Sequence, residues 1–263
     1  MTDDRAKALE ALRFNWAPVA DDVWRPAPFH VEGLHRATER MVLQGIDDAL
    51  RSVDASPIGL ALQGQRGTGK THLLGWVREQ IHVHDGYFFL VSLLDAEGFW
   101  ASVVQSLDEG LSRSAGGKAA QLRTLLRDLG DRVGAPRTVR RAVAGDTTLT
   151  RESLDAFIEL LCAYDPLVGR ECQETARALA LLASDSAPMR EVGETYLQSI
   201  SDDHNERAGW GMRRTRRPAE LIVRDLSWLL ALSGPTVIAV DQIDTLIAQS
   251  AKTLRAGGPD GPV

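Results

Sequence analysis

The stretch from Ile58 to Thr71, IGLALQGQRGTGKT, constrains the fold of this chain more than any other part of it. A short apolar run leads into a glycine-rich loop, and the loop ends in a Lys-Thr pair. Gly64, Gly69, Lys70 and Thr71 satisfy the pattern G-x-x-x-x-G-K-[ST]. The backbone N–H groups of such a loop surround phosphate, and the helix that follows directs the positive end of its dipole at it. The pattern predicts a phosphate-binding loop between a buried strand and a helix.

Each residue type in this loop has a chemical reason. Glycines permit positive φ and let the backbone approach a ligand closely. Lys70 is expected to reach the β- and γ-phosphates of a nucleoside triphosphate, and the Thr71 hydroxyl to bind Mg²⁺. The residues predicted to contact the nucleotide are Gly64, Gln65, Arg66, Gly67, Thr68, Gly69, Lys70 and Thr71.

Composition narrows the class of protein. A length of 263 residues with 44% hydrophobic content suffices for one large or two small domains with a real core. The formal net charge of −6 supplies no overall basic field, so nucleic acid would have to bind at local patches. Cys162 and Cys172 lack the spacing of a metal site or disulfide scaffold. With neither an apolar leader nor a run of about 18 apolar residues, we expect a cytoplasmic protein without membrane contact.

Three apolar runs are predicted to be parallel strands of one buried sheet, at residues Ile58–Gln63, Tyr87–Leu94 and Thr236–Val240. A helix predicted over 70–82 joins the first two in a right-handed βαβ unit. The expected fold class is therefore α/β with a parallel sheet.

Helical periods fill much of the remaining chain. Helices are expected over 4–13, 34–53, 95–112, 118–129, 153–163, 167–183, 189–198 and 219–232. Asp165 before Pro166, and Ser186 before Pro188, are typical of helix N-termini. The glycine-rich stretch that follows residue 129 is predicted to be a mobile connection.

An acidic residue, Asp241, ends the last apolar run, and Gln242 follows it. A carboxylate at the C-terminal end of a buried strand beside a phosphate loop can hold Mg²⁺ through water. We therefore predict Asp241 as a metal ligand together with Thr71. The alternative is a helix N-cap at the strand exit, which is the commoner role of such an aspartate where no phosphate loop precedes it.

The loop, its GKTHLL continuation and the late strand with its terminal acid resemble the P-loop NTPases, and most of all the AAA+ and related ATPases of the additional-strand division. The resemblance covers residues 58–113 and 218–247. It implies a P-loop NTPase core with a large helical insertion, ATP and Mg²⁺ as ligands, and ATPase activity. One departure is Gln242, because that division usually has a glutamate there to polarise the attacking water. The Asp-Gln pair resembles that of STAND-type signalling ATPases.

Lys70 and Gln242 are the predicted catalytic residues, and Asp244 is an alternative base. An amide orients water but does not accept its proton as a carboxylate does, so more than one function stays open. The first is an ATPase module that couples nucleotide state to conformational change in a larger protein or assembly. The second is a nucleotide-gated switch or scaffold that binds ATP with little hydrolysis. A small-molecule kinase is weaker, because no lid motif or acceptor site is evident.

The resemblance also divides the chain into parts. These are an N-terminal arm and helix (1–57), the P-loop βαβ part (58–115), the helical insertion (116–217), the Walker B part (218–247) and a flexible tail (248–263). The basic cluster Arg213, Arg214, Arg216 and Arg217 has three open interpretations: a nucleic-acid contact, a charge supplied to a neighbouring subunit's nucleotide, or a solvated loop. The same alternatives apply to Arg137, Arg140 and Arg141. A homo-oligomer or larger assembly is the expected context.

The strand order 5-1-4-3-2 of the additional-strand division implies a fourth strand between the P-loop strand and the Walker B strand. That strand should follow the Walker B strand in sequence, but Thr245–Val263 is too rich in glycine and proline to supply it. We therefore expect an N-terminal part of a longer ATPase, incomplete at its C-terminus. The alternative is the other P-loop division, where the two strands are direct neighbours.

Overall fold

A computed structural model describes residues 23–24, 36–51, 58–65, 68–92, 98–114, 119–202 and 205–241. The chain forms two compact units, Met1–Gln80 and Ile81–Val263. The helix predicted over 4–13 and the predicted tail 248–263 lie outside the described residues. The domain bounds expected from the sequence stay a prediction.

Two helices account for most of the described part of the first unit. They are α2 (Arg36–Arg51) and α3 (Lys70–Val83), which extends past the boundary between the units. Both agree with the predicted helices within a few residues. Val42 and Ile46 are buried on α2, four residues apart and hence on one face. A side chain at Gly45 would come within 3.8 Å of Leu60, so the segment before the glycine-rich loop passes beside α2.

The prediction of a strand at Ile58–Gln63 is wrong, because these residues form neither a strand nor a helix. Ile58 and Leu60 are 50% and 44% exposed, so this apolar run is not buried in a sheet. A run of this kind becomes a strand only where a neighbour satisfies its backbone N–H and C=O groups. In the described part of the chain the sheet has two strands instead of the three predicted.

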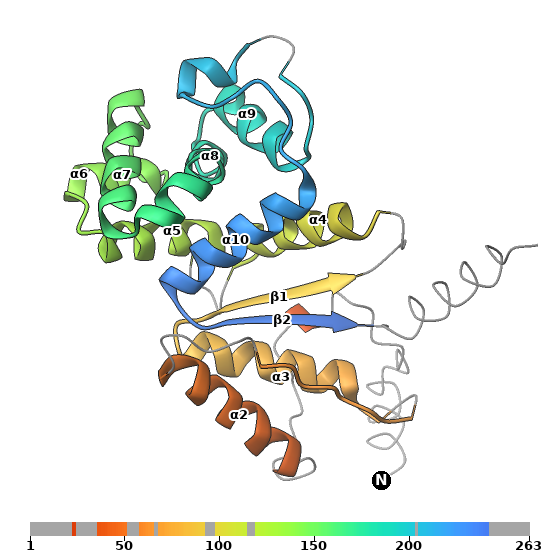
Figure 1. Ribbon diagram of the computed structural model, residues 1–263. Helices are drawn as coiled ribbons and strands as arrows, with labels where there is room; N and C mark the ends of the chain where they lie inside the picture. The colour runs from red at the N-terminus through yellow and green to blue at the C-terminus, as the bar shows by residue number, and fades with distance from the viewer. Residues whose placement is uncertain are drawn as a thin grey trace, which may run out of the picture. The chain divides into compact units, whose positions relative to one another are not determined.

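These two strands lie in the second unit. They are β1 (Tyr87–Ser92) and β2 (Thr236–Asp241), which pair in parallel, with Tyr87 opposite Thr236 and Ser92 opposite Asp241 (Figure 1). The sequence predicts a buried strand here, but β2 is only partly buried, since Ile238 and Val240 are 45% and 43% exposed.

Gln121 satisfies the backbone of β1 on the side away from β2. Its side chain is buried, and its Oε1 accepts a hydrogen bond from the Phe88 N–H at 2.9 Å. Its Nε2 donates to the carbonyl oxygens of Phe88 at 3.0 Å and Gly110 at 2.7 Å. A side-chain amide therefore makes the bonds that a further strand would otherwise make.

The remaining helices belong to the second unit, and those predicted from periodicity are confirmed. They are α4 (Phe99–Ser112), α5 (Gln121–Arg132), α6 (Arg137–Val143), α7 (Arg151–Tyr164), α8 (Pro166–Leu182), α9 (Ala187–Leu197) and α10 (Ala219–Ser233), with a 3₁₀ helix at Arg207–Trp210. Asp165 caps α8 as expected, its Oδ1 accepting from the N–H groups of Leu167 and Val168 at 3.0 Å. Ser186 precedes α9 without such a side-chain bond.

Helix α6 corrects the predicted mobile connection after residue 129. Ala142, Val143, Ala144 and Leu149 are all buried, so this stretch packs into the core. With only seven residues, α6 is too short to show a helical period in the sequence.

A continuous apolar core lies between the sheet and the outer helices. Helices α4 and α10 lie beside the sheet, and α7, α8 and α9 lie farther from it (Figure 1). Phe89, Leu107, Leu125, Leu179 and Leu226 all belong to this core. The predicted insertion therefore shares a core with α4 and α10. Among the described helices, none combines the length and apolar character needed to cross a bilayer.

Candidate functional site

The glycine-rich loop curls back so that the Lys70 side chain lies over its beginning. Lys70 Nζ donates hydrogen bonds to the carbonyl oxygens of Gly64 at 2.8 Å and Gln65 at 3.0 Å. The Gln65 carbonyl also accepts from the Thr68 N–H at 3.3 Å and from Thr68 Oγ1 at 2.9 Å. Residues up to six apart in sequence are thus brought together by their own hydrogen bonds.

Two glycines make this curl possible. Gly69 has φ +84°, a conformation that costs an L-residue energy. A Cβ at Gly64 would lie 2.8 Å from Thr68 Oγ1, too close for an unstrained contact. The glycines predicted for conformational freedom therefore have that role at these positions.

Helix α3 begins directly after the loop. Its first hydrogen bond runs from the Leu73 N–H to the Gly69 carbonyl oxygen at 2.9 Å. The N–H groups before that bond have no acceptor within the helix, and they carry the positive end of its dipole. Lys70 and Thr71 are the first two residues of this turn, so the N-terminus of the helix carries both the ammonium and the hydroxyl side chain.

The charge of Lys70 is not neutralised by any residue that the structure describes. Two carbonyl oxygens occupy two of the three N–H donors of its ammonium group. Carbonyl groups carry no net charge, so among the described residues the positive charge and one donor of Lys70 have no anionic partner. This arrangement is suited to a phosphate group.

The structure brings together part of the predicted nucleotide site. Gly64, Gln65, Thr68, Gly69, Lys70 and Thr71 form one loop and helix start. Arg66, Gly67, Gln242 and Asp244 lie outside the described residues. Asp241 ends β2 and belongs to the second unit, whereas the loop belongs to the first. No cluster of three or more His, Cys, Asp or Glu that could hold a metal occurs in the described ranges. Magnesium binding by Thr71 and Asp241 stays a prediction.

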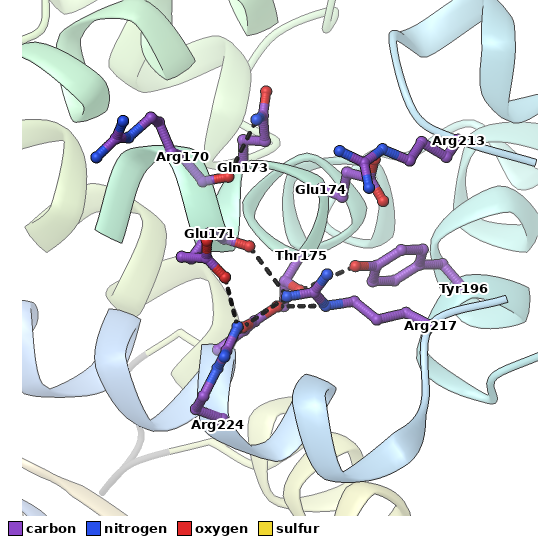
Figure 2. A network of polar contacts seen from close by, with 10 residues as sticks. Arg170, Glu171, Gln173, Glu174, Thr175, Tyr196, Arg213, Arg217 and Arg224 are labelled. Carbon is purple, nitrogen blue, oxygen red and sulfur yellow. Dashed lines mark hydrogen bonds and ion pairs between the residues drawn. The ribbon is translucent and has the colours of Figure 1, made fainter. Parts of the chain in front are cut away.

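A buried ion-pair network in the second unit was not predicted from the sequence. Its centre is Asp225 on α10, whose side chain is fully buried. Arg217 approaches both carboxylate oxygens, at 3.0 and 2.7 Å, and Thr175 Oγ1 on α8 donates at 2.8 Å (Figure 2). Arg224 donates to Asp225 at 3.1 Å and to Glu171 at 2.9 Å. The network ties α8, α10 and the segment before α10 together.

The network corrects the interpretation of the basic cluster before α10. Arg217 is 16% exposed and serves the internal carboxylate, so it is not a surface contact for nucleic acid. Arg213 is 77% exposed and pairs with Glu174 at 3.2 Å, and Arg214 and Arg216 are exposed. The four arginines therefore do not form one uniform patch.

The burial of Asp225 could have been predicted from the helical periodicity of the sequence. It lies three residues after Ile222 and four before Leu229, both fully buried, so a charge falls on the apolar face of the helix. A charge in that position requires a buried partner. The identity of the partner depends on the tertiary fold.

Comparisons with family models, with curated proteins and with solved structures gave no match to this chain.

Proposed function

We propose that this chain is an ATP-binding, Mg²⁺-dependent P-loop module of AAA+-like type, which couples nucleotide state to conformational change in a larger protein or assembly. The observation that supports it is the position of the Lys70 ammonium, held over the loop by the Gly64 and Gln65 carbonyl groups at the N-terminus of α3. A phosphate in the loop would meet a charge, a helix dipole and a hydroxyl group together.

In this proposal each site residue has a separate task. Lys70 neutralises charge on the β- and γ-phosphates, while Thr71 and Asp241 hold Mg²⁺. Gln242 orients the attacking water. The choice of ATP over other nucleoside triphosphates rests on the resemblance of the motifs.

A second candidate is a nucleotide-gated switch or scaffold that binds ATP with little turnover. It is favoured by Gln242, which stands where the resemblance leads us to expect a glutamate. A glutamine amide cannot take the proton of the attacking water, so binding can persist where hydrolysis is slow.

Equilibrium binding of Mg·ATP tests the shared part of both candidates. We expect the wild-type chain to bind and Lys70→Ala to lose measurable binding, because the loop loses its only ammonium group. Arg40→Ala is the matched control, since it removes an equal charge from an exposed position on α2 in the same unit. Equal affinity of Lys70→Ala and Arg40→Ala, both folded by circular dichroism, would exclude the loop as the site.

Steady-state turnover, measured beside binding, separates the two candidates. Turnover by the wild-type chain supports the ATPase, and tight binding without turnover supports the switch. We expect Gln242→Glu to leave turnover unchanged or raise it. A fall of about tenfold, or about 1.4 kcal/mol on the barrier, would show that the glutamine has a role that a carboxylate cannot fill.

A further inference from the structure

A hollow of about 370 Å³ lies beside α6, far along the chain from the glycine-rich loop. Its described lining consists of Arg137, Thr138, Arg141 and Thr147. The two arginines are four residues apart on one helix, so they project from the same side of it. Gly145, with φ +74°, reverses the chain after α6 and brings Thr147 back to the helix. The four described lining residues thus carry two guanidinium groups and two hydroxyl groups, and none of them carries a carboxylate.

The arginines of this region differ in their partners. On α5, Arg127 donates to Asp146 at 2.6 Å and 3.2 Å. The side chains of Arg137 and Arg141 are exposed and make no hydrogen bond or ion pair with any residue in the described part of the chain. Asp146 attracts Arg141 at longer range, but its hydrogen bonds to Arg127 lower its pKa and already compensate its charge. Two guanidinium groups therefore remain available beside the hollow.

The backbone that carries these side chains is held firmly. Val143 and Ala144, at the end of α6, are fully buried. A side chain at Gly145 would collide with the Ala183 carbonyl oxygen, so the turn after α6 fits closely against the end of α8. A donor set on a fixed backbone loses less conformational entropy when it binds a ligand.

We propose that this hollow binds the phosphate group of a small phosphorylated molecule. The planar forks of two arginines match phosphate oxygens, and the threonine hydroxyl groups add neutral donors. The volume lies within the range of about 300–1,000 Å³ of small-molecule sites, so the phosphate can enter with the group that carries it. No aromatic side chain occurs in the described lining to stack on the bases of a nucleic-acid strand. The proposal does not depend on ATP binding by the glycine-rich loop.

Titration of the full chain, followed by the chemical shifts of backbone amides, locates such binding by residue. The probes are inorganic phosphate and ribose 5-phosphate, each added at constant ionic strength. The titration is carried out on the Lys70→Ala variant, so that the loop cannot account for the result. We expect the amide signals of residues 137–147 to shift saturably with both probes. The affinity derived from these shifts should be higher for ribose 5-phosphate than for inorganic phosphate. Absence of saturable shifts there for both probes would overturn the proposal.

Matched variants test the arginine pair. Arg137→Ala/Arg141→Ala should weaken binding about tenfold, as expected for the loss of two charge-assisted contacts worth about 1.4 kcal/mol together. Arg170→Ala/Arg190→Ala removes two exposed arginines elsewhere in the same unit and should change affinity less than about twofold. An equal loss in both pairs would mean non-specific attraction and overturn a defined site. A single-stranded RNA oligonucleotide that binds residues 137–147 more tightly than ribose 5-phosphate would overturn the choice of a small molecule.

Discussion

At the residue scale, the most unusual side chain is that of Arg207 in the 3₁₀ helix. It is fully buried, and none of its side-chain nitrogen atoms has a hydrogen-bond partner among the described residues. Its guanidinium carbon lies 5.5 Å from the centre of the Tyr196 ring, and burial lowers its pKa. A buried charge without a hydrogen-bonded partner costs stability, and the Tyr196 ring together with the Coulombic attraction of Asp202 and Glu174 offsets only part of that cost.

Replacement of Arg207 by methionine should therefore raise the free energy of unfolding, by about 1 kcal/mol, because the apolar chain remains and the buried charge is removed. Urea unfolding at pH 7 measures the change. The control is Arg177→Met, since Arg177 is also buried but pairs with Asp155 at 2.6 Å and donates to the Trp210 carbonyl. The free energy of unfolding of that variant should be about 3 kcal/mol lower than that of the wild type. If Arg207→Met is destabilised as much as Arg177→Met, the buried guanidinium has a partner that supports the fold.

Asp146 should make stability depend on pH. The hydrogen bond from Arg127 holds its pKa below the ordinary value, although burial opposes this. A carboxyl group with a lowered pKa in the folded state adds stability above its unfolded pKa of about 3.9, and that contribution is lost as pH falls through the folded value. Asp146→Asn should thus cost about 1 kcal/mol at pH 7 and progressively less below about pH 3.9. Asp185→Asn, at an 88% exposed partner of Arg123, should show little change at either pH in urea unfolding. A pH-independent cost of Asp146→Asn would contradict this account.

At the element scale, the short sheet depends on a helix as much as on its second strand. Gln121 at the start of α5 bonds both backbone groups of Phe88 and the carbonyl oxygen of Gly110. Phe88 is fully buried, so water cannot replace these bonds. Each buried backbone N–H or C=O group at the edge of a strand lowers the stability of the fold if it has no hydrogen-bond partner.

We expect Gln121→Ala to lower the free energy of unfolding by about 3 kcal/mol, because the hydrogen bonds of its side chain to the buried Phe88 N–H and carbonyl groups and to the Gly110 carbonyl are lost. Gln105→Ala is the control, since Gln105 is exposed on α4 and its side chain donates to the exposed Glu109 at 3.0 Å. Gln105→Ala should change the free energy of unfolding by less than about 0.5 kcal/mol. Chemical denaturation of both variants gives the comparison, and similar values for the two would argue against a role of Gln121 in closing the strand.

At the scale of the whole molecule, the glycine-rich loop and the strand that ends in Asp241 belong to different compact units. A ligand that binds only the folded state stabilises it by mass action. If the loop binds Mg·ATP, nucleotide at about 100 times its dissociation constant should stabilise the folded chain by about 2.7 kcal/mol.

Thermal unfolding with and without Mg·ATP measures this effect, and hydrogen exchange should show the protection first at residues 68–73. Removal of Mg²⁺ by a chelator should reduce the shift in unfolding temperature, and Lys70→Ala should abolish it. A shift of equal size in Lys70→Ala would place the nucleotide elsewhere in the molecule.

The sequence alone determined the features that depend on neighbouring residues. The loop geometry follows from the spacing of Gly64, Gly69 and Lys70, and the start of α8 follows from Asp165 and Pro166. Long helices were predicted because each contains several turns of one apolar period, which short-range spacing can show.

Only the tertiary structure decided the features that depend on distant partners. The run 58–63 is as apolar as a strand, but the described sheet pairs β1 with β2 and includes no partner for it. Arg217 resembled its exposed neighbours until the fold placed it against Asp225. Hydrogen bonds within a loop or cap join residues a few positions apart, whereas strand pairing and buried ion pairs need groups that the folded backbone brings together. The local spacing of residues therefore predicted the candidate phosphate loop, and long-range packing decided which apolar runs and charges are buried.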